Sequence, residues 1–239
     1  DVSYFDISNG AAHAMNIQKD APFGLFIGQS LSKIYYYHGS DRGKVFYSYK
    51  LDDNSTKKHS IENFTVIRVV GIDNQPDIVL TCGVYTETEP RLGFYLVDLN
   101  TSKVTKTLHQ FDLNRLPDGD PGIYAGDFYK FADQIFFRFS KRTGIFRFDR
   151  HANFVGELTT PDLFDFPKEQ SEACYEEHEN LYRELFVHAE KLYVRTNYIN
   201  TPNRLIIFDI YDLKENQYIN SLAVKLDPGG EYLFGQLWV

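Results

Sequence analysis

The sequence has few of the features that are typical of disulfide-rich, membrane-spanning and nucleic-acid-binding proteins. Its 239 residues include only two cysteines, Cys82 and Cys174, which are too few for a disulfide framework. Cys82 lies in an apolar run and is expected to be a small buried hydrophobe. No apolar run approaches the roughly 18 residues that span a bilayer, so we expect no transmembrane segment. Lys and Arg total 25 against 33 Asp and Glu, and the net charge of −8 argues against binding to nucleic acid.

The motifs of common catalytic and metal sites are also missing. The sequence contains no Gly-x-Ser-x-Gly, no glycine-rich phosphate loop and no Cys-x-x-Cys pair. Its seven histidines show no His-x-His or His-x-x-x-His spacing that would bring two imidazoles to one metal. The acidic turn at 116–122 lacks the further ligands of a calcium loop. We therefore expect no cofactor and no metal, and the sequence leans against an enzyme without excluding one.

Aromatic residues, in contrast, are abundant. They make up 16% of the chain, with 17 Tyr and 20 Phe. Their wide rings pack well on a pleated, half-buried surface, so this enrichment favours β-strands. A length of 239 residues is compatible with one all-β domain, and no shift in composition marks a boundary. We expect a single domain over residues 1–239.

A paired pattern recurs four times along the chain. An apolar run is followed by a polar turn and a second run that usually closes on Asp. The first runs are Lys33–Tyr37, Asp77–Thr81, Gln134–Arg138 and Lys191–Arg195, and the second runs are Val45–Lys50, Gly93–Asp98, Gly144–Asp149 and Leu205–Asp209. Alignment equates Lys50, Asp98, Asp149 and Asp209, which lie 48, 51 and 60 residues apart. This spacing is close to one blade of a β-propeller.

Each pair is preceded by one more extended run and followed by another after a turn. The preceding runs are Phe23–Gln29, Thr65–Gly71, Ile123–Tyr129 and Leu181–Val187. The repeated unit therefore has an inner strand, a second, a third and an outer strand. We predict an all-β protein, a β-propeller of four-stranded antiparallel blades.

The two ends each carry part of a blade. Tyr4–Gly10 follows the pattern of a third strand and its turn, and Glu231–Gln236 follows that of an inner strand. Propellers often close by letting both termini share one sheet, which hides free strand edges. We predict five blades, four complete and one shared by the termini. The alternative is a part of a six-bladed propeller.

At Phe94–Val104 the hairpin resembles those of bacterial β-propellers of the broad TolB-like, six-bladed kind. The resemblance covers nearly the whole chain but is architectural, so it implies the fold far more than an activity. We expect an exported bacterial protein, periplasmic or extracellular, that binds an unknown protein or a small polar or glycan ligand.

Candidate binding residues follow from aligning the inner strands, which line the central channel of a propeller. Gln29, Asp127 and Gln236 fall at equivalent places, and Arg68 and Glu184 fall near the same level. One hypothesis is a ring of polar side chains that holds a small polar ligand. The alternative is a water-filled channel with no specific ligand.

Two further hypotheses concern chemistry and partners. Asp127 and Glu184 are candidates for the acid and base of a glycan-acting hydrolase or lyase, since glycoside hydrolysis uses two carboxylates across a pocket. Propeller glycosidases place acids on three inner strands, however, and this chain offers Gln29 and Arg68 in the first two blades. The acidic segment 161–180 departs furthest from the repeat and is a candidate partner-binding loop. A non-enzymatic binding protein is our leading hypothesis.

Overall fold

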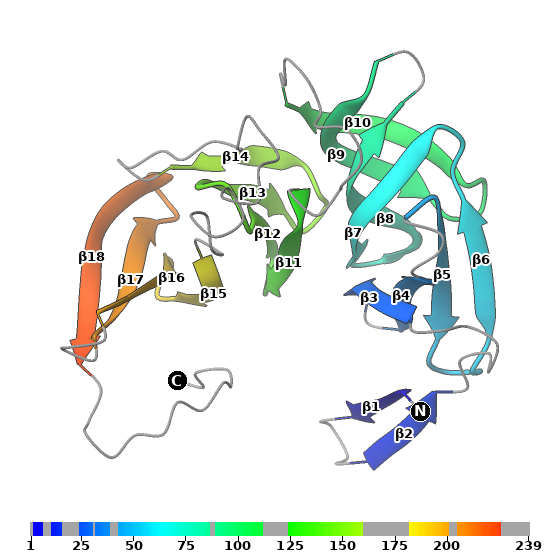
Figure 1. The fold of residues 1–239 in the computed structure, drawn as a ribbon, viewed down its shortest axis with the longest axis horizontal. Helices are drawn as coiled ribbons and strands as arrows, with labels where there is room; N and C mark the ends of the chain where they lie inside the picture. The colour runs from blue at the N-terminus through cyan, green and yellow to red at the C-terminus, as the bar shows by residue number, and fades with distance from the viewer. Residues whose placement is uncertain are drawn as a thin grey trace. The chain divides into compact units, whose positions relative to one another are not determined.

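The described part of the chain is built from β-strands. The computed structural model describes residues 2–6, 11–15, 24–30, 32–38, 43–86, 89–111, 124–159, 182–200 and 205–225. Strands β1 to β18 make up the regular structure in these ranges (Figure 1). The residues described contain no helix that is long and apolar enough to cross a membrane. The all-β prediction is confirmed.

Four consecutive groups of four antiparallel strands follow the predicted pattern, and we call them repeats 1 to 4. Strands that are neighbours in sequence are neighbours in each repeat. The first strand of each repeat matches a predicted inner strand. The repeats comprise β3 (Gly24–Gln29), β4 (Lys33–His38), β5 (Val45–Lys50) and β6 (Thr56–Ser60); β7 (Phe64–Ile72), β8 (Gln75–Tyr85), β9 (Arg91–Asp98) and β10 (Lys103–Gln110); β11 (Gly126–Phe131), β12 (Gln134–Phe139), β13 (Ile145–Asp149) and β14 (Phe154–Leu158); and β15 (Tyr182–His188), β16 (Lys191–Asn200), β17 (Leu205–Asp212) and β18 (Gln217–Lys225).

The N-terminal strands form a separate antiparallel pair. β1 (Val2–Asp6) pairs with β2 (Ala11–Met15). β1 contains the start of the run that predicted a third strand near the N-terminus. The matching C-terminal run, Glu231–Gln236, lies outside the described residues. The number of blades therefore stays a prediction.

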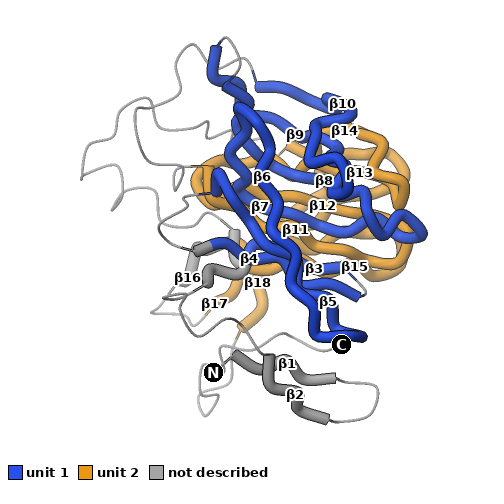
Figure 2. The backbone as a smooth tube through the Cα atoms, turned by 90° about the vertical axis from the view of Figure 1, so that its right-hand side faces the viewer, with its two compact units in different colours: residues 1–116 blue, residues 117–239 orange. Residues whose placement is uncertain are grey.

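The chain divides into two compact units, residues 1–116 and 117–239 (Figure 2). Each unit contains two complete repeats. In the first unit, β3 and β7 pair in parallel at Gly28 with Val69 and at Gln29 with Val70, which joins repeats 1 and 2 into one eight-stranded sheet. Gly28 permits this pairing, because a Cβ atom at this position would collide with the carbonyl oxygen of Val69.

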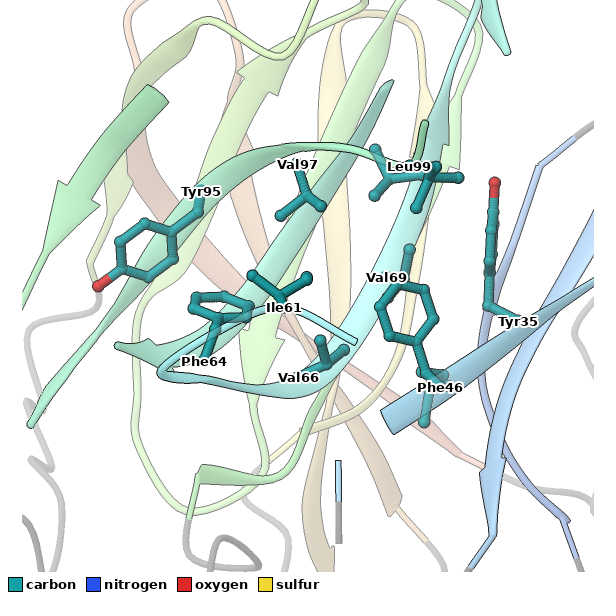
Figure 3. Close-up of a cluster of buried hydrophobic side chains, with 11 residues drawn as sticks. Tyr35, Phe46, Ile61, Phe64, Val66, Val69, Tyr95, Val97 and Leu99 are labelled. Atoms are coloured by element: carbon teal, nitrogen blue, oxygen red, sulfur yellow. The ribbon is translucent and has the colours of Figure 1, made fainter. Parts of the chain in front are cut away.

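Within each unit, the two repeats pack through their apolar faces. In the first unit, the cluster contains Ile27, Tyr35 and Phe46 of repeat 1 with Phe64, Val66, Val69, Val79, Tyr95 and Val97 of repeat 2 (Figure 3). In the second unit, Phe136, Ile145 and Leu158 of repeat 3 meet Leu185, Leu192, Val194, Tyr211 and Leu213 of repeat 4. Burial of each such side chain contributes about 1.5–3 kcal/mol, so the seam between repeats is a main source of stability.

A recurrent aspartate closes the turn after the third strand of repeats 2 to 4. Oδ1 of Asp98 accepts hydrogen bonds from the backbone N–H groups of Asn100 and Thr101, and Asp149 does the same for His151 and Asn153. This local bonding favours the turn over a continued strand.

In repeat 4, the aspartate at this place is Asp212, not Asp209 as the sequence alignment predicted. Asp212 accepts hydrogen bonds from the N–H groups of Lys214 and Glu215 and pairs with Lys191, the first residue of β16. Asp209 lies three residues earlier in β17, where it is buried and accepts a 2.6 Å hydrogen bond from Ser221 Oγ. The correction makes the last spacing 63 residues.

Cys82 and His59 are both buried in the first unit. Cys82 is fully buried and free, which confirms its prediction as a small hydrophobe, whereas Cys174 lies outside the described residues. His59 is 1% exposed on β6, with Nε2 2.8 Å from Ser48 Oγ and its ring stacked on Phe46 at 5.0 Å. Burial, with a smaller contribution from Lys57, lowers the pKa of His59 to about 4.

We predict that His59 makes the protein sensitive to mild acid. The unfolded chain takes up a proton at His59 near pH 6.5, whereas the folded chain does so only near pH 4. The free energy of unfolding should therefore fall by roughly 3 kcal/mol as the pH drops from 6.5 to 4, with no contribution from His59 above this window. Urea denaturation at pH 7 and at about pH 4.5 measures the loss.

The control for this prediction is a second histidine. His59→Gln should flatten the pH dependence, whereas His188→Gln changes an exposed residue and should leave it as in the wild type. An unchanged pH dependence in His59→Gln would contradict the assignment.

Candidate functional site

Two predicted site residues, Asp127 and Glu184, occupy equivalent positions in repeats 3 and 4. Asp127 on β11 pairs with Arg138 on β12, and Glu184 on β15 pairs with Arg195 on β16. Each arginine is the fifth residue of its strand. The acid and the arginine form an ion pair in both repeats, at 3.5 Å between Asp127 Oδ2 and Arg138 and 3.3 Å between Glu184 Oε2 and Arg195.

Tyr129 joins the ion pair of repeat 3. It lies two residues after Asp127 on β11, so the two side chains point to the same face of the strand. Nε of Arg138 donates a 3.0 Å hydrogen bond to the Tyr129 hydroxyl, and the guanidinium carbon lies 5.7 Å from the ring centroid. Arg138 therefore binds Asp127 and Tyr129 together, which compensates for burial of its charge.

The charge of Glu184, the acid of repeat 4, also acts on this tyrosine. Burial raises the pKa of Tyr129, the charge and hydrogen bond of Arg138 lower it, and the charges of Asp127 and Glu184 raise it further. Strands β11 and β15 are in direct contact. Asp127 and Glu184 therefore lie on neighbouring strands, and the charges of both act on Tyr129. We call Asp127, Tyr129, Arg138, Glu184 and Arg195 the two-acid cluster.

Exposure differs sharply within the two-acid cluster. The side chains of Arg138 and Arg195 are 7% and 13% exposed, whereas those of Asp127 and Glu184 are 47% and 32% exposed. The arginines are thus more deeply buried than the acids, whose side chains stay partly accessible to solvent. Carboxylates are acceptors with several lone-pair sites, so the cluster can accept hydrogen bonds from hydroxyl or amine groups of a ligand.

Arg195 has unused hydrogen-bonding capacity. Its Nη1 donates to Glu184. Its Nε is buried without a hydrogen-bond partner among the described residues. Buried donors are usually satisfied, and an exception costs about 1–3 kcal/mol. The pair in repeat 4 is therefore less completely bonded than its counterpart in repeat 3, where Nε of Arg138 reaches Tyr129.

The site residues predicted in the first unit lie on the two strands that pair in parallel. Gln29 is exposed on β3 and pairs with Val70. Arg68 on β7 is partly buried, and its Nη1 donates a 2.9 Å hydrogen bond to the Ile67 carbonyl. Arg68 pairs in register with Cys82, whose thiol pKa is raised by burial. The structure thus places Gln29 and Arg68 at the seam of repeats 1 and 2.

Other predicted features fall outside the described residues. These are Gln236, the turn at 116–122 and the acidic segment 161–180. A common channel lined by residues of both units stays a prediction. The described residues contain no group of three or more His, Cys, Asp or Glu side chains that could hold a metal ion.

Sequence analysis missed three members of the two-acid cluster: Tyr129, Arg138 and Arg195. A signal for them was present. Arg closes both Gln134–Arg138 and Lys191–Arg195, and antiparallel pairing across a short turn places the end of the second strand beside the start of the first. Tyr129 follows Asp127 at the two-residue period of a strand.

Comparison with known proteins identifies the fold and nothing finer. No protein-family model matches the chain, and no curated protein does. Among solved structures, the chain is similar to the Dos1 propeller, with 10% identity, a TM-score of 0.50, and coverage of 95% of this chain and 54% of that one. It is also similar to hydrazine synthase of Kuenenia stuttgartiensis, with 10% identity, a TM-score of 0.49, and coverage of 88% of this chain and 51% of that one. A chain of a nidogen–laminin complex is similar with 12% identity, a TM-score of 0.47, and coverage of 92% of this chain and 70% of that one.

The Dos1 structure is a β-propeller, and this distant similarity agrees with the four-stranded antiparallel repeats of the chain. This chain spans about half the length of the Dos1 and hydrazine synthase chains that it matches. At such low identity the likeness extends to the fold alone.

We predict opposite shifts of the Tyr129 pKa when its neighbours are replaced. Asp127→Asn and Glu184→Gln each remove a negative charge and should lower the pKa of Tyr129. Arg138→Met removes a cation and a hydrogen-bond donor and should raise it. NMR titration of ring-labelled tyrosine measures each shift. Glu157→Gln alters another acid–arginine pair, on β14, and serves as the control. If Glu184→Gln leaves the pKa of Tyr129 unchanged, Glu184 of repeat 4 does not act on this tyrosine.

Proposed function

We propose that the chain is a non-enzymatic binding protein whose two-acid cluster holds a neutral, hydroxyl-rich ligand such as a glycan. The observation that carries the proposal is the pair of arginine-bound carboxylates on the neighbouring strands β11 and β15, which belong to adjacent repeats. Each carboxylate is matched by an arginine that is largely buried, so the cluster has little net charge. A ligand rich in hydroxyl groups suits such a surface better than an ion does, because it donates hydrogen bonds without adding charge.

The pairing of the acids favours binding over hydrolysis. A glycosidase uses one carboxyl group as a proton donor and the other as a base or nucleophile across the scissile bond. Here each carboxylate forms an ion pair with an arginine of its own repeat. The arginines orient the acceptor oxygens, which suits recognition. A glycan-acting hydrolase or lyase with Asp127 and Glu184 as the acid pair is the second candidate, because the two residues lie on neighbouring strands and are both partly exposed.

Binding and cleavage can be tested on the same variants. We expect neutral mono- and oligosaccharides to shift the NMR signals of Asp127, Tyr129 and Glu184, with acetate and methylammonium as charged controls. Asp127→Ala and Glu184→Ala should each weaken binding about tenfold or more, since a lost charge-assisted hydrogen bond costs about 1.5–3 kcal/mol. Glu157→Ala removes an acid that is also paired with an arginine, Arg142, but lies on the outer strand β14, and should leave binding unchanged.

The outcomes separate the candidates. Binding that survives both alanine substitutions would contradict a site at the two-acid cluster. Release of nitrophenol from nitrophenyl glycosides, lost in Asp127→Ala and in Glu184→Ala, would favour the hydrolase. If no saccharide binds, the ligand class is wrong.

We also propose that residues 1–239 form one propeller domain with a fifth blade shared by the termini. The antiparallel pair β1–β2 supports this, because it matches the third and outer strands of a blade. A ring of blades that bury one another should unfold as one cooperative system. Differential scanning calorimetry should therefore show a single transition with equal calorimetric and van't Hoff enthalpies. Two separate transitions would contradict the proposal.

A further inference from the structure

Strand β18 presents an open edge with apolar side chains. It is the last strand of repeat 4, and within the described residues it pairs only with β17 (Figure 1). Every residue of β18 except Tyr218 is exposed. Ile219, Leu222 and Val224 are 43%, 47% and 38% exposed, and three of the four exposed large hydrophobic residues among those described lie on this strand.

The other outer strands carry features that discourage pairing with another chain. β6 has Lys57 and Lys58 within five residues, and β10 has Lys103 and Lys106 together with two irregularities in its pairing. β14 has only five residues, an irregularity in its pairing and a charge at Glu157. Lysines, short strands and bulges all protect natural sheet edges. β18 has nine residues, a single irregularity in its pairing near its start, and no charge before its final residue, Lys225.

The sequence of β18 suits antiparallel pairing with a second copy of the same strand. Residues Asn220–Lys225 pair with β17 without interruption, so this stretch offers a regular edge. In an antiparallel pair of two copies with the two-fold axis at Ala223, Leu222 of one copy lies opposite Val224 of the other, and Lys225 lies opposite Ser221. Apolar side chains then meet on one face, and no like charges face each other.

We propose that β18 pairs with β18 of a second copy of this chain to form a symmetric dimer. Main-chain hydrogen bonds would join the two repeat 4 sheets into one eight-stranded sheet. The net charge of −8 opposes association at long range, but salt at physiological strength screens charges beyond about 8 Å. The contact itself contains no acid. The dimer is independent of the ligand site proposed above.

Sedimentation velocity over a range of concentrations at physiological salt tests the proposal. The wild-type chain should show a monomer–dimer equilibrium. Leu222→Lys introduces the charge that β6 and β10 carry on their edges, and should raise the dissociation constant about tenfold or more. Val155→Lys is the matched control, since Val155 is 50% exposed on the outer strand β14, and should leave the dimer intact. Circular dichroism and thermal unfolding check that both variants fold.

Hydrogen exchange distinguishes the possible occupants of the edge. In the dimer, those amides of residues 221–225 that point away from β17 should gain protection as the protein concentration rises, and Leu222→Lys should abolish this gain. A chain that stays monomeric at the highest attainable concentration overturns the proposal. Protection of the same amides that does not depend on concentration also overturns it, because another segment of the same chain then covers β18. Dissociation of the dimer by Val155→Lys would place the interface elsewhere.

Discussion

The fold depends on apolar burial between adjacent repeats. A single four-stranded sheet has two faces and no way to cover them, so one repeat alone leaves its aromatic and aliphatic side chains in water. In the second unit, Phe136 and Ile145 of repeat 3 lie against Leu192 and Val194 of repeat 4. The two-acid cluster is a result of the same contact, because it brings β11 and β15 side by side.

Much of the architecture could be predicted from the sequence, because each repeat carries its own local signals. Alternating aromatic residues and Asp-containing turns indicated the four strands of each repeat. The same alignment placed Asp127 and Glu184 near one level, and in the structure each pairs in register with an arginine of the next strand. The place of a residue along its strand can be predicted from its sequence neighbours, and residues at the same place in different repeats can therefore be aligned. The number of blades is not local in this sense, and the described residues leave it open.

Where the prediction failed, the cause was a feature that pattern counting does not detect. Pairing between β16 and β17 is interrupted between Arg195 and Ile199, so the residues of β17 no longer match their counterparts in the other repeats. Counting from the apolar run therefore selected Asp209 in place of Asp212. The parallel pairing of β3 with β7 was also missed, because it depends on the backbone at Gly28 lying close to Val69 in a distant part of the sequence.

That parallel pairing gives the two units different internal joints. Repeats 1 and 2 share main-chain hydrogen bonds as well as side-chain packing. Repeats 3 and 4, within the described residues, meet through side chains such as Arg147 of repeat 3, which donates to the Leu213 carbonyl of repeat 4. A backbone ladder resists shear because its bonds must break together, while packed side chains slide one contact at a time. Under mechanical load, we therefore expect the joint beside the two-acid cluster to be the more compliant of the two.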